Sequence, residues 1–298
     1  MKDGYGRKTF YRRYKNEVAY MPPKRCPSDN DVFRRTKIDV NTMEVLDHIF
    51  IKESQRVYRM GFLLKGIDPA DFHIFNCTYT GNHQVIYTPY GDAEVAHPEA
   101  FEVLDEGGFT HTGRKFPDGV LLSEGKNTED RYYCHSYGRD GEFVYFFTEF
   151  TQTRKAVRLK ACHEPETFEV LAMEWMFALA KDNKHVYYED HTVKNADCKT
   201  VEYIGDGYWR DSRHMFFHGH VVDGADVDSF EIIEPEHIVK RADADVFKKI
   251  ACEHRIIGGG HKHKIAVAAD KNHYYKSGKI FDEYKPCLLY TYDAADAL

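Results

Sequence analysis

The stretch that decides the fold is Asp182–Tyr188, which reads DNKHVYY. An Asp followed by polar residues is typical of a turn, because its short side chain accepts hydrogen bonds from nearby backbone N–H groups. The Val-Tyr-Tyr that follows is typical of a β-strand, since β-branched and aromatic residues are enriched there. The stretch therefore predicts a turn that leads into a strand. The same pattern, with Glu or Asn sometimes replacing Asp, begins at Glu53, Asn82, Asp140, Asp211 and Asp270.

A second element recurs with the first and reads acidic residue, often Pro, two residues, then an apolar anchor. It starts 10 residues after the aromatic residue of the first element in four places, which are Tyr58, Tyr87, Tyr187 and Phe216. Neighbouring anchors are 29 to 33 residues apart, apart from one gap of 67 residues, which is close to two units. The spacing indicates a repeated unit. The anchors are Met43, Phe72, Phe101, Phe168, Val201 and Phe230.

Each unit can be interpreted from its residues. After the first strand comes a turn that contains Gly61, Gly91, Gly219 or Gly278, and a second short strand such as Leu63–Leu64 follows. The next Asp is typical of a helix N-cap, and Pro is favoured at the first helical position. We therefore expect a hairpin plus a short helical turn or a third strand, with Asp68 and Asp226 as caps.

One unit of this length cannot bury its own apolar face, so neighbouring units must stack. We therefore interpret the recurring Tyr and Phe residues as core. The predicted fold is mainly β with short helical turns, a tandem array of about seven or eight hairpin repeats over residues 39–281. We expect an open, solenoid-like array, with propeller-like closure as the alternative. This fold predicts that Tyr58, Tyr87, Tyr187 and Phe216 occupy equivalent positions.

Four segments depart from the repeat. Residues 1–38 form a basic N-terminal segment. Residues 107–128 are rich in Gly, and residues 234–264 replace a unit with a possible helix, so these two segments are where a specific function would be grafted. We do not expect residues 282–298 to belong to the fold, because the string PCLLYTYDAADAL at its end resembles translated sequencing-adapter sequence.

The first element resembles the signature of the DKNYY family of repeat proteins. The best match is Asp270–Tyr275, DKNHYY, with secondary matches at Ala180–Tyr188 and Arg210–Phe217 and a typical G-A-D-x-x-S-F at Gly224–Phe230. The resemblance covers roughly residues 40–281. It implies a bacterial repeat protein, and it implies no catalytic residue, since the uncharacterised family has none to carry over.

Composition and charge exclude several classes. The chain has 298 residues, of which 42% are hydrophobic, too apolar for a disordered chain. Its best apolar run, Phe168–Ala180, contains Glu169 and Glu174 and is shorter than the roughly 18 residues of a membrane span. No secretory signal is recognised. The 7 cysteines are dispersed, without a C-x-x-C pair, so we expect reduced thiols and a cytoplasmic location.

Two histidine pairs are candidate metal ligands. His218 and His220, and likewise His261 and His263, lie two residues apart, which on a strand places both imidazoles on one face, as zinc or another transition metal requires. We interpret the first pair as solvated residues of an inter-strand turn. The second pair lies with His254 in the irregular segment 234–264 and keeps a metal-dependent hydrolase open as an alternative function.

Other reactive motifs are not found. The sequence contains no G-x-S-x-G, H-E-x-x-H or Walker A pattern. Gly258–Gly260 lacks the G-K-[ST] of a phosphate-binding loop, and we interpret it as a flexible loop. The regularly placed Asp residues are interpreted as caps and turns. We therefore assign no catalytic, cofactor-binding or metal-binding residue and expect no cofactor.

The N-terminal segment offers another alternative. Residues 1–37 carry 11 Lys and Arg against 4 Asp and Glu, whereas the whole chain has a net charge of −7. Arg7–Lys15, RKTFYRRYK, interleaves basic and aromatic residues, a combination that binds phosphates and stacks on bases. The competing interpretation is an edge strand whose cations prevent aggregation. Anion or nucleic-acid binding stays open, although the acidic remainder makes nucleic acid an unfavoured partner.

The sequence thus predicts a non-enzymatic repeat protein that offers an extended surface to another protein or acts as a scaffold. Stacked units create such a surface, and nothing in the units concentrates reactive groups. We expect no membrane as a partner and identify no small-molecule ligand.

Overall fold

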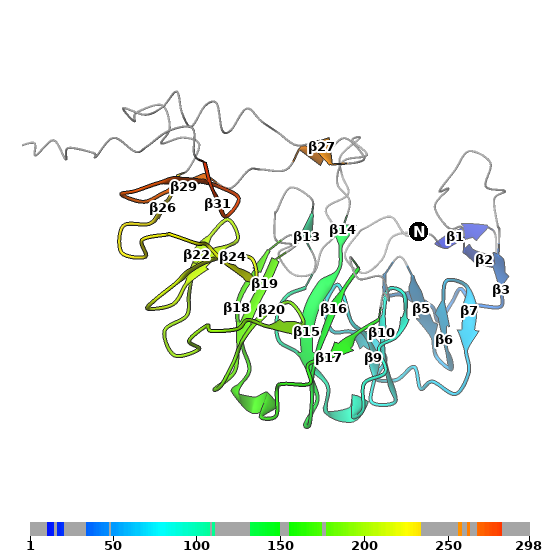
Figure 1. Cartoon of the computed structure of the whole chain (residues 1–298). Coiled ribbons are helices and arrows are strands. Elements are labelled where there is room, and N and C mark those ends of the chain that lie inside the picture. Colours follow the sequence, from blue (N-terminus) through cyan, green and yellow to red (C-terminus); the bar gives the residue numbers. More distant parts are fainter. Residues whose placement is uncertain are drawn as a thin grey trace, which may run out of the picture. The chain divides into compact units, whose positions relative to one another are not determined.

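The protein is mainly β (Figure 1). The computed structural model describes residues 11–14, 17–20, 34–47, 49–107, 109–110, 132–149, 155–174, 177–233, 256–257, 261–262 and 267–281. The chain divides into an N-terminal unit, residues 1–176, and a C-terminal unit, residues 177–298.

The N-terminal unit contains sheets of order β1-β2-β3, β4-β5-β6-β7, β8-β9-β10-β11 and β12-β15-β16-β17, with a separate ribbon β13-β14. All of their described pairings are antiparallel. The strands are β1 (Tyr11–Tyr14), β2 (Glu17–Tyr20), β3 (Arg34–Thr36), β4 (Glu44–Val45), β5 (Phe50–Glu53), β6 (Arg56–Arg59), β7 (Phe62–Leu64), β8 (His73–Ile74), β9 (Thr80–Asn82), β10 (Val85–Thr88), β11 (Gly91–Asp92), β12 (Glu102–Val103), β13 (Phe109–Thr110), β14 (Tyr132–Tyr133), β15 (His135–Arg139), β16 (Val144–Thr148), β17 (Val157–Arg158) and β18 (Glu169–Glu174).

The C-terminal unit repeats this plan. Strands β19, β20 and β21 are neighbours, two further sheets have the orders β22-β23-β24-β25 and β26-β29-β30-β31, and β27-β28 is a separate ribbon. Each described sheet has two open edges, so none of them closes on itself into a barrel. The strands are β19 (Phe177–Lys181), β20 (Val186–Tyr188), β21 (His191–Thr192), β22 (Glu202–Gly205), β23 (Tyr208–Arg210), β24 (Met215–Phe217), β25 (His220–Val221), β26 (Glu231–Ile232), β27 (Ile256–Ile257), β28 (His261–Lys262), β29 (Val267–Ala269), β30 (Tyr274–Lys276) and β31 (Lys279–Ile280).

The Tyr and Phe residues of the first sequence element occupy one position in their sheets. Each lies on the next-to-last strand of its sheet and pairs with the last strand, as in Tyr58 with Leu63 and Phe216 with Val221. Tyr58, Tyr187 and Phe216 are buried, whereas Tyr87 is half-buried. The four residues therefore share one strand position, as the sequence predicts, but Tyr87 differs from the others in burial. The remaining pairs are Tyr87 with Asp92, Tyr145 with Arg158, Tyr187 with Thr192 and Tyr275 with Ile280.

A tight turn joins the third and fourth strands. Between β6 and β7, Met60 and Gly61 have φ angles of 51° and 78°. Positive φ at both central residues is the geometry of a type I′ turn, whose twist matches that of the flanking strands. Ser277 and Gly278 repeat it between β30 and β31, with φ angles of 46° and 77°.

The core of the N-terminal unit is built from residues of neighbouring sheets. Ile51 and Tyr58 cluster with Tyr11, Val18 and Tyr20 of the first sheet. Because successive residues of a strand point to opposite faces, the adjacent Phe50 and Val57 cluster on the other side. They contact Phe72 there, together with Ile74 and Tyr87 of the sheet β8-β9-β10-β11.

The same packing occurs further along the chain. In the N-terminal unit, Tyr79 and Ile86 pack with Tyr145 and Phe147 of the sheet that follows. In the C-terminal unit, Tyr208 and Met215 pack with Ala268 and Tyr275. Each cluster thus combines two sheets, and these sheets bury apolar residues on facing surfaces.

The predicted unit was incomplete in two respects. The sheets are meanders of four strands rather than a hairpin with one added element, because strands form both after the anchor and before the Asp turn. Short 3-10 turns, η1 (Pro98–Ala100) and η3 (Pro165–Thr167), form at two anchors. At Asp68 and Asp226 the carboxylate accepts a nearby N–H group, but no helix follows in residues 68–74 or 226–233.

The two irregular segments enter their sheets at the same connection. Residues 107–128 lie between β12 and β15, which are the first and second strands of one sheet. Residues 234–264 lie between β26 and β29, again the first and second strands. The possible helix predicted in the second segment lies outside the described residues. So do residues 282–298.

Candidate functional site

A buried carboxylate closes the turn before the third strand in four sheets. Oδ1 of Asp140 accepts hydrogen bonds from the N–H groups of Glu142 and Phe143 at 2.9 and 2.7 Å. The turn predicted from the sequence is formed, with the Asp side chain as its acceptor. Asp182, Asp211 and Asp270 accept the equivalent two bonds at 2.6 to 2.8 Å.

The second carboxylate oxygen binds the strand that follows. The Tyr145 hydroxyl donates to Oδ2 of Asp140 at 2.8 Å, and the Tyr275 hydroxyl donates to Oδ2 of Asp270 at 2.6 Å. Asp211 lacks this bond, because the corresponding residue is Phe216. The recurring acid and the Tyr five residues later are therefore one hydrogen-bonded pair.

The same oxygen also binds the anchor element of its sheet. The backbone N–H of His97 donates to Oδ2 of Asp140 at 3.1 Å. Asp197 and Asp226 donate in the same way to Asp211 and Asp270, at 3.0 and 2.7 Å. This contact joins the two sequence elements, even where the first residue of the anchor element, Asp226, precedes the acid Asp270 by 44 residues.

These bonds set the charge of the turns. Burial raises the pKa of Asp140, but hydrogen bonds from Glu142, Phe143, Tyr145 and His97 outweigh it, so the net pKa lies below its usual value. The pKa values of Asp182 and Asp211 are also lowered, by hydrogen bonds that outweigh their burial. The carboxylates are therefore ionised at neutral pH.

The arrangement leaves these acids little catalytic capacity. Asp140 accepts four hydrogen bonds, which matches the roughly four lone-pair directions of a carboxylate. A general base needs a lone pair within reach of the substrate proton. Burial also raises the pKa of Tyr145 and Tyr275, which makes their hydroxyls weak acids. The Asp140 carboxylate and Tyr145 thus join the turn to the strand that follows, which is the turn role that the sequence predicts for the repeated Asp.

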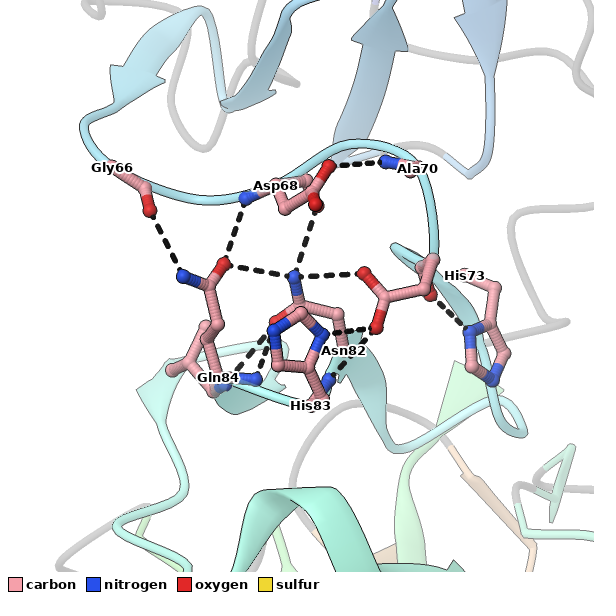
Figure 2. A network of polar contacts seen from close by, with 9 residues as sticks. Gly66, Asp68, Ala70, His73, Asn82, His83 and Gln84 are labelled. Carbon is pink, nitrogen blue, oxygen red and sulfur yellow. Dashed lines mark hydrogen bonds and ion pairs between the residues drawn. The ribbon is translucent and has the colours of Figure 1, made fainter.

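A neutral version of the turn is shown in Figure 2. Asn82 replaces the Asp, and its Oδ1 accepts the N–H groups of Gln84 and Val85 at 3.0 and 3.2 Å. Its Nδ2 donates to the carbonyl oxygen of Asp68 at 2.9 Å. Because an amide nitrogen cannot accept, the Asp68 N–H binds Oε1 of Gln84 at 2.8 Å instead.

The most polar exposed pair of this network is His83 with Asp71. His83 Nδ1 lies 2.5 Å from Oδ2 of Asp71. This hydrogen bond raises the pKa of His83 and lowers that of Asp71. Such a pair can orient a histidine as a general base, but it needs a nucleophile beside it. The Asp71 carboxylate also accepts Nδ2 of Asn82 at 3.3 Å and the N–H of His83 at 3.2 Å, so it belongs to the polar network around the Asn82 turn.

His218 of the first predicted pair lies in the turn between β24 and β25, as expected, but it is half-buried rather than fully solvated. Its Nδ1 lies 2.9 Å from the Tyr188 hydroxyl, and its ring packs against Phe177 and Phe217. Burial and the nearby His220 lower the pKa of His218 to about 4. The aromatic contacts remove this imidazole from water, whereas His220 is exposed.

Most of the other candidates lie outside the described residues. His261 belongs to β28, while His254, His263 and Gly258–Gly260 are not described. Among the residues that are described, no three His, Cys, Asp or Glu side chains gather as a metal site. In the same part of the chain, no helix has the length and apolar character to cross a membrane.

The basic N-terminal stretch is only partly described. Arg12 and Arg13 lie exposed on β1, which is an edge strand of its sheet. Tyr11, the neighbouring residue on β1, is fully buried. Its hydroxyl donates to the Ile49 carbonyl oxygen at 2.7 Å and accepts from the Gly61 N–H at 3.2 Å. Tyr11 is therefore a core residue, unavailable for stacking on a base.

Sequence reasoning missed an apolar edge at β7. Phe62 and Leu63 are 58% and 46% exposed, among the few large exposed apolar side chains of the described residues. The signal was present in the hairpin Arg56–Lys65, RVYRMGFLLK, which carries three cations and no acid. The run of three apolar residues was interpreted only as a second strand.

The comparisons place the chain in a family. The DKNYY family matches residues 82–279, about two thirds of the chain. The described chain is built of small antiparallel sheets, four of which have a buried Asp in the turn before a strand. In particular, it belongs to the DKNYY family. No match is found among curated proteins or solved structures. The sheet β4-β5-β6-β7 precedes the matched residues, although its Glu53 turn resembles those within them.

Proposed function

We propose that this chain is a non-enzymatic protein that binds a protein partner through an extended surface of stacked sheets. In this proposal residues 39–281 form an open, solenoid-like array of repeats, between a basic segment, residues 1–38, and a tail, residues 282–298. The bacterial cytoplasm is the proposed location. The thiols of Cys134 and Cys198, which form no disulfide, support a reducing compartment.

The observation that carries the proposal is the use of polar groups inside the sheets. The buried carboxylates bind backbone N–H groups and Tyr hydroxyls within their own sheet, as Asp140 and Asp270 do. The buried aromatic residues pack between sheets. The described sheets therefore present their outer surfaces and strand edges to other molecules. Repeat proteins bind their partners through extended surfaces of this kind.

The test begins with capture and ends with purified components. The full chain, immobilised in its folded form, is exposed to an extract of its source cells beside a heat-denatured control. Each protein retained only by the folded chain is then purified and titrated by calorimetry. The proposal predicts saturable binding to at least one purified protein. If no purified protein binds, the proposal is wrong. Stoichiometric zinc or another transition metal in the purified chain would favour the hydrolase alternative instead.

A further inference from the structure

Two cysteines from neighbouring sheets lie in contact within the N-terminal unit. Cys77 lies in the turn between β8 and β9, and Cys134 directly precedes β15. The thiol of Cys134 donates to the carbonyl oxygen of Cys77, with 3.5 Å between the sulfur and the oxygen. Because the two residues are 57 positions apart in the chain, the fold rather than the local sequence brings them together.

Hydrogen bonds on both sides of Cys77 fix its turn to β15. Asn76 Nδ2 donates to Oγ of Ser136 at 2.8 Å, and the Tyr79 hydroxyl donates to the Ser136 carbonyl oxygen at 3.3 Å. The Asn76 side chain also closes the turn, since its Oδ1 accepts the Tyr79 N–H at 2.9 Å. Ser136 is two residues after Cys134. The contact between the two cysteines is therefore built into the packing of the two sheets.

The separation of the two cysteines suits a disulfide. A carbonyl oxygen lies about 2.4 Å from the Cα atom of its own residue. The Cys134 sulfur therefore lies within about 6 Å of the Cys77 Cα. The two Cα atoms of a disulfide are about 4.4–6.8 Å apart. A bond between the two sulfurs is thus within reach through rotation of the two side chains.

The two thiols differ in their access to solvent. Cys77 is half-buried, whereas Cys134 is buried and packs in the cluster of Tyr79 and Phe147. Burial raises the pKa of Cys134 well above its usual range, and the nearby Glu149 and Cys77 add to this effect. Cys134 is therefore a protonated thiol at neutral pH, and an oxidant dissolved in water meets Cys77 first.

We propose that Cys77 and Cys134 form a reversible disulfide when the chain meets a peroxide. The Cys77 thiolate attacks one peroxide oxygen, the O–O bond breaks, and a sulfenic acid forms at Cys77. Cys134 then loses its proton and attacks that sulfur, so that the S–S bond forms and the hydroxyl group leaves as water. Overall, the two thiols lose two protons and two electrons, and one hydrogen peroxide becomes two water molecules.

The disulfide joins two neighbouring sheets and stabilises the N-terminal unit. It closes a loop of 57 residues, which restricts the unfolded chain. In a reducing compartment the pair stays as thiols, and a small thiol such as glutathione restores them after oxidation. The reaction needs no partner protein, so the inference goes beyond the proposed function.

The test uses the full chain, reduced and then treated with hydrogen peroxide or with buffer alone. Remaining thiols are blocked with N-ethylmaleimide, the chain is digested without reduction, and the peptides are identified by mass spectrometry. We expect the main cross-link among the 7 cysteines to join Cys77 to Cys134 and to disappear after dithiothreitol. The oxidised chain should also unfold about 5 °C or more above the reduced chain.

Variants assign the reaction to the two thiols. Cys77→Ser should abolish both the cross-link and the rise in unfolding temperature. Cys134→Ala should leave a sulfenic acid at Cys77, which dimedone labels. The matched control is Cys198→Ser, because Cys198 is also half-buried but belongs to the C-terminal unit, and it should keep the cross-link. Thermal unfolding of each reduced variant checks that the fold is retained, and Cys77→Ser suffices if the buried Cys134→Ala does not fold.

Several outcomes would overturn the inference. These are a main cross-link from Cys77 to a different cysteine, a Cys77–Cys77 link between two chains, or Cys77 oxidised to a sulfinic acid without any cross-link. Peroxide that leaves both thiols unreacted would do the same. If a purified partner protein binds the chain while no Cys77–Cys134 cross-link forms, the proposed function stands and this inference alone fails.

Discussion

The turns at Asp270 and Asn82 solve the same structural problem with different charge. At Asp270 one carboxylate side chain accepts two N–H groups within the turn, the Tyr275 hydroxyl and the Asp226 N–H. Asn82 has only one acceptor oxygen, so the anchor N–H of Asp68 turns to Gln84. The comparison shows that the turn keeps its geometry with either an Asp or an Asn. With Asn, a second side chain must accept the anchor N–H group, as Gln84 does.

The largest effect is expected where the ionised acceptor is removed. Asp211→Ala leaves the N–H groups of Arg213, His214 and Asp197 without their acceptor. We expect the free energy of unfolding to fall by about 3 kcal/mol or more. Urea denaturation measures the change, with Asp228→Ala as the control, because Asp228 is exposed. A loss no greater than that of the control would mean that water replaces the carboxylate.

The next largest effect is the pH dependence of stability that His218 contributes, which falls at a higher pH than that of the Asp turns. Burial and nearby His220 lower the pKa of His218 from 6.5 to about 4. His218 is therefore protonated at a lower pH in the folded state than in the unfolded state. This contribution to stability is complete above pH 6.5 and is lost as the pH falls through about 4, by up to about 3 kcal/mol. His218→Asn, which suits the positive φ of 54°, should flatten this dependence in urea titrations. An unchanged slope would contradict the assignment.

Below this pH range, the Asp turns should dominate the pH dependence of stability. The lowered pKa values of Asp182 and Asp211 mean that their stabilisation is complete above about pH 4, near the unfolded value. It is lost as the pH falls through the lower folded values. Hydrogen exchange below about pH 4 should therefore show the Asp182 and Asp211 turns opening before the Asn82 turn, which carries no titrating side chain in the Asp position. Simultaneous opening would remove the distinction between the two kinds of turn.

A smaller effect tests whether the Asn–Gln arrangement of the Asn82 turn can be introduced into the Asp270 turn. Asp270→Asn removes the acceptor of the Asp226 N–H and should cost about 1–2 kcal/mol. Adding Asn272→Gln places an amide oxygen where Gln84 acts in the other turn. We expect the second change to recover about half of the loss, and a double-mutant cycle measures it. Strictly additive losses would show that the compensation depends on other residues.

The smallest effect is expected at the compensating residue itself. Gln84→Ala removes the acceptor of the Asp68 N–H, but both residues are exposed and water can take its place. The expected loss is about 0.5 kcal/mol or less, measured in the same urea titrations. A loss as large as that of Asp211→Ala would mean that the two turns depend equally on their acceptors.

Sequence reasoning located what is encoded locally. The Asp turn and the third strand, as at Asp182 and Tyr187, arise from adjacent residues with strong preferences. Strands such as β9, Thr80–Asn82, lack such a pattern, so the four-stranded meander was not predicted. The bond between Asp226 and Asp270 joins residues 44 positions apart, a distance at which no spacing rule applies.

The candidate site was predictable only in part. His218 was assigned correctly to a turn, but its burial depends on Tyr188 and Phe177 of another sheet. The exposure of Phe62 and Leu63 depends on the absence of a described strand beside β7, which local sequence does not reveal.

The shared connection between first and second strands has a practical consequence. Two long segments enter there, yet the anchor-to-acid bonds from His97 to Asp140 and from Asp226 to Asp270 are kept. Lengthening a loop costs little free energy, since each doubling adds only about 0.6 kcal/mol. The corresponding short turn at Asp206–Gly207 is therefore a suitable point for splicing a fluorescent reporter or an affinity tag into the chain.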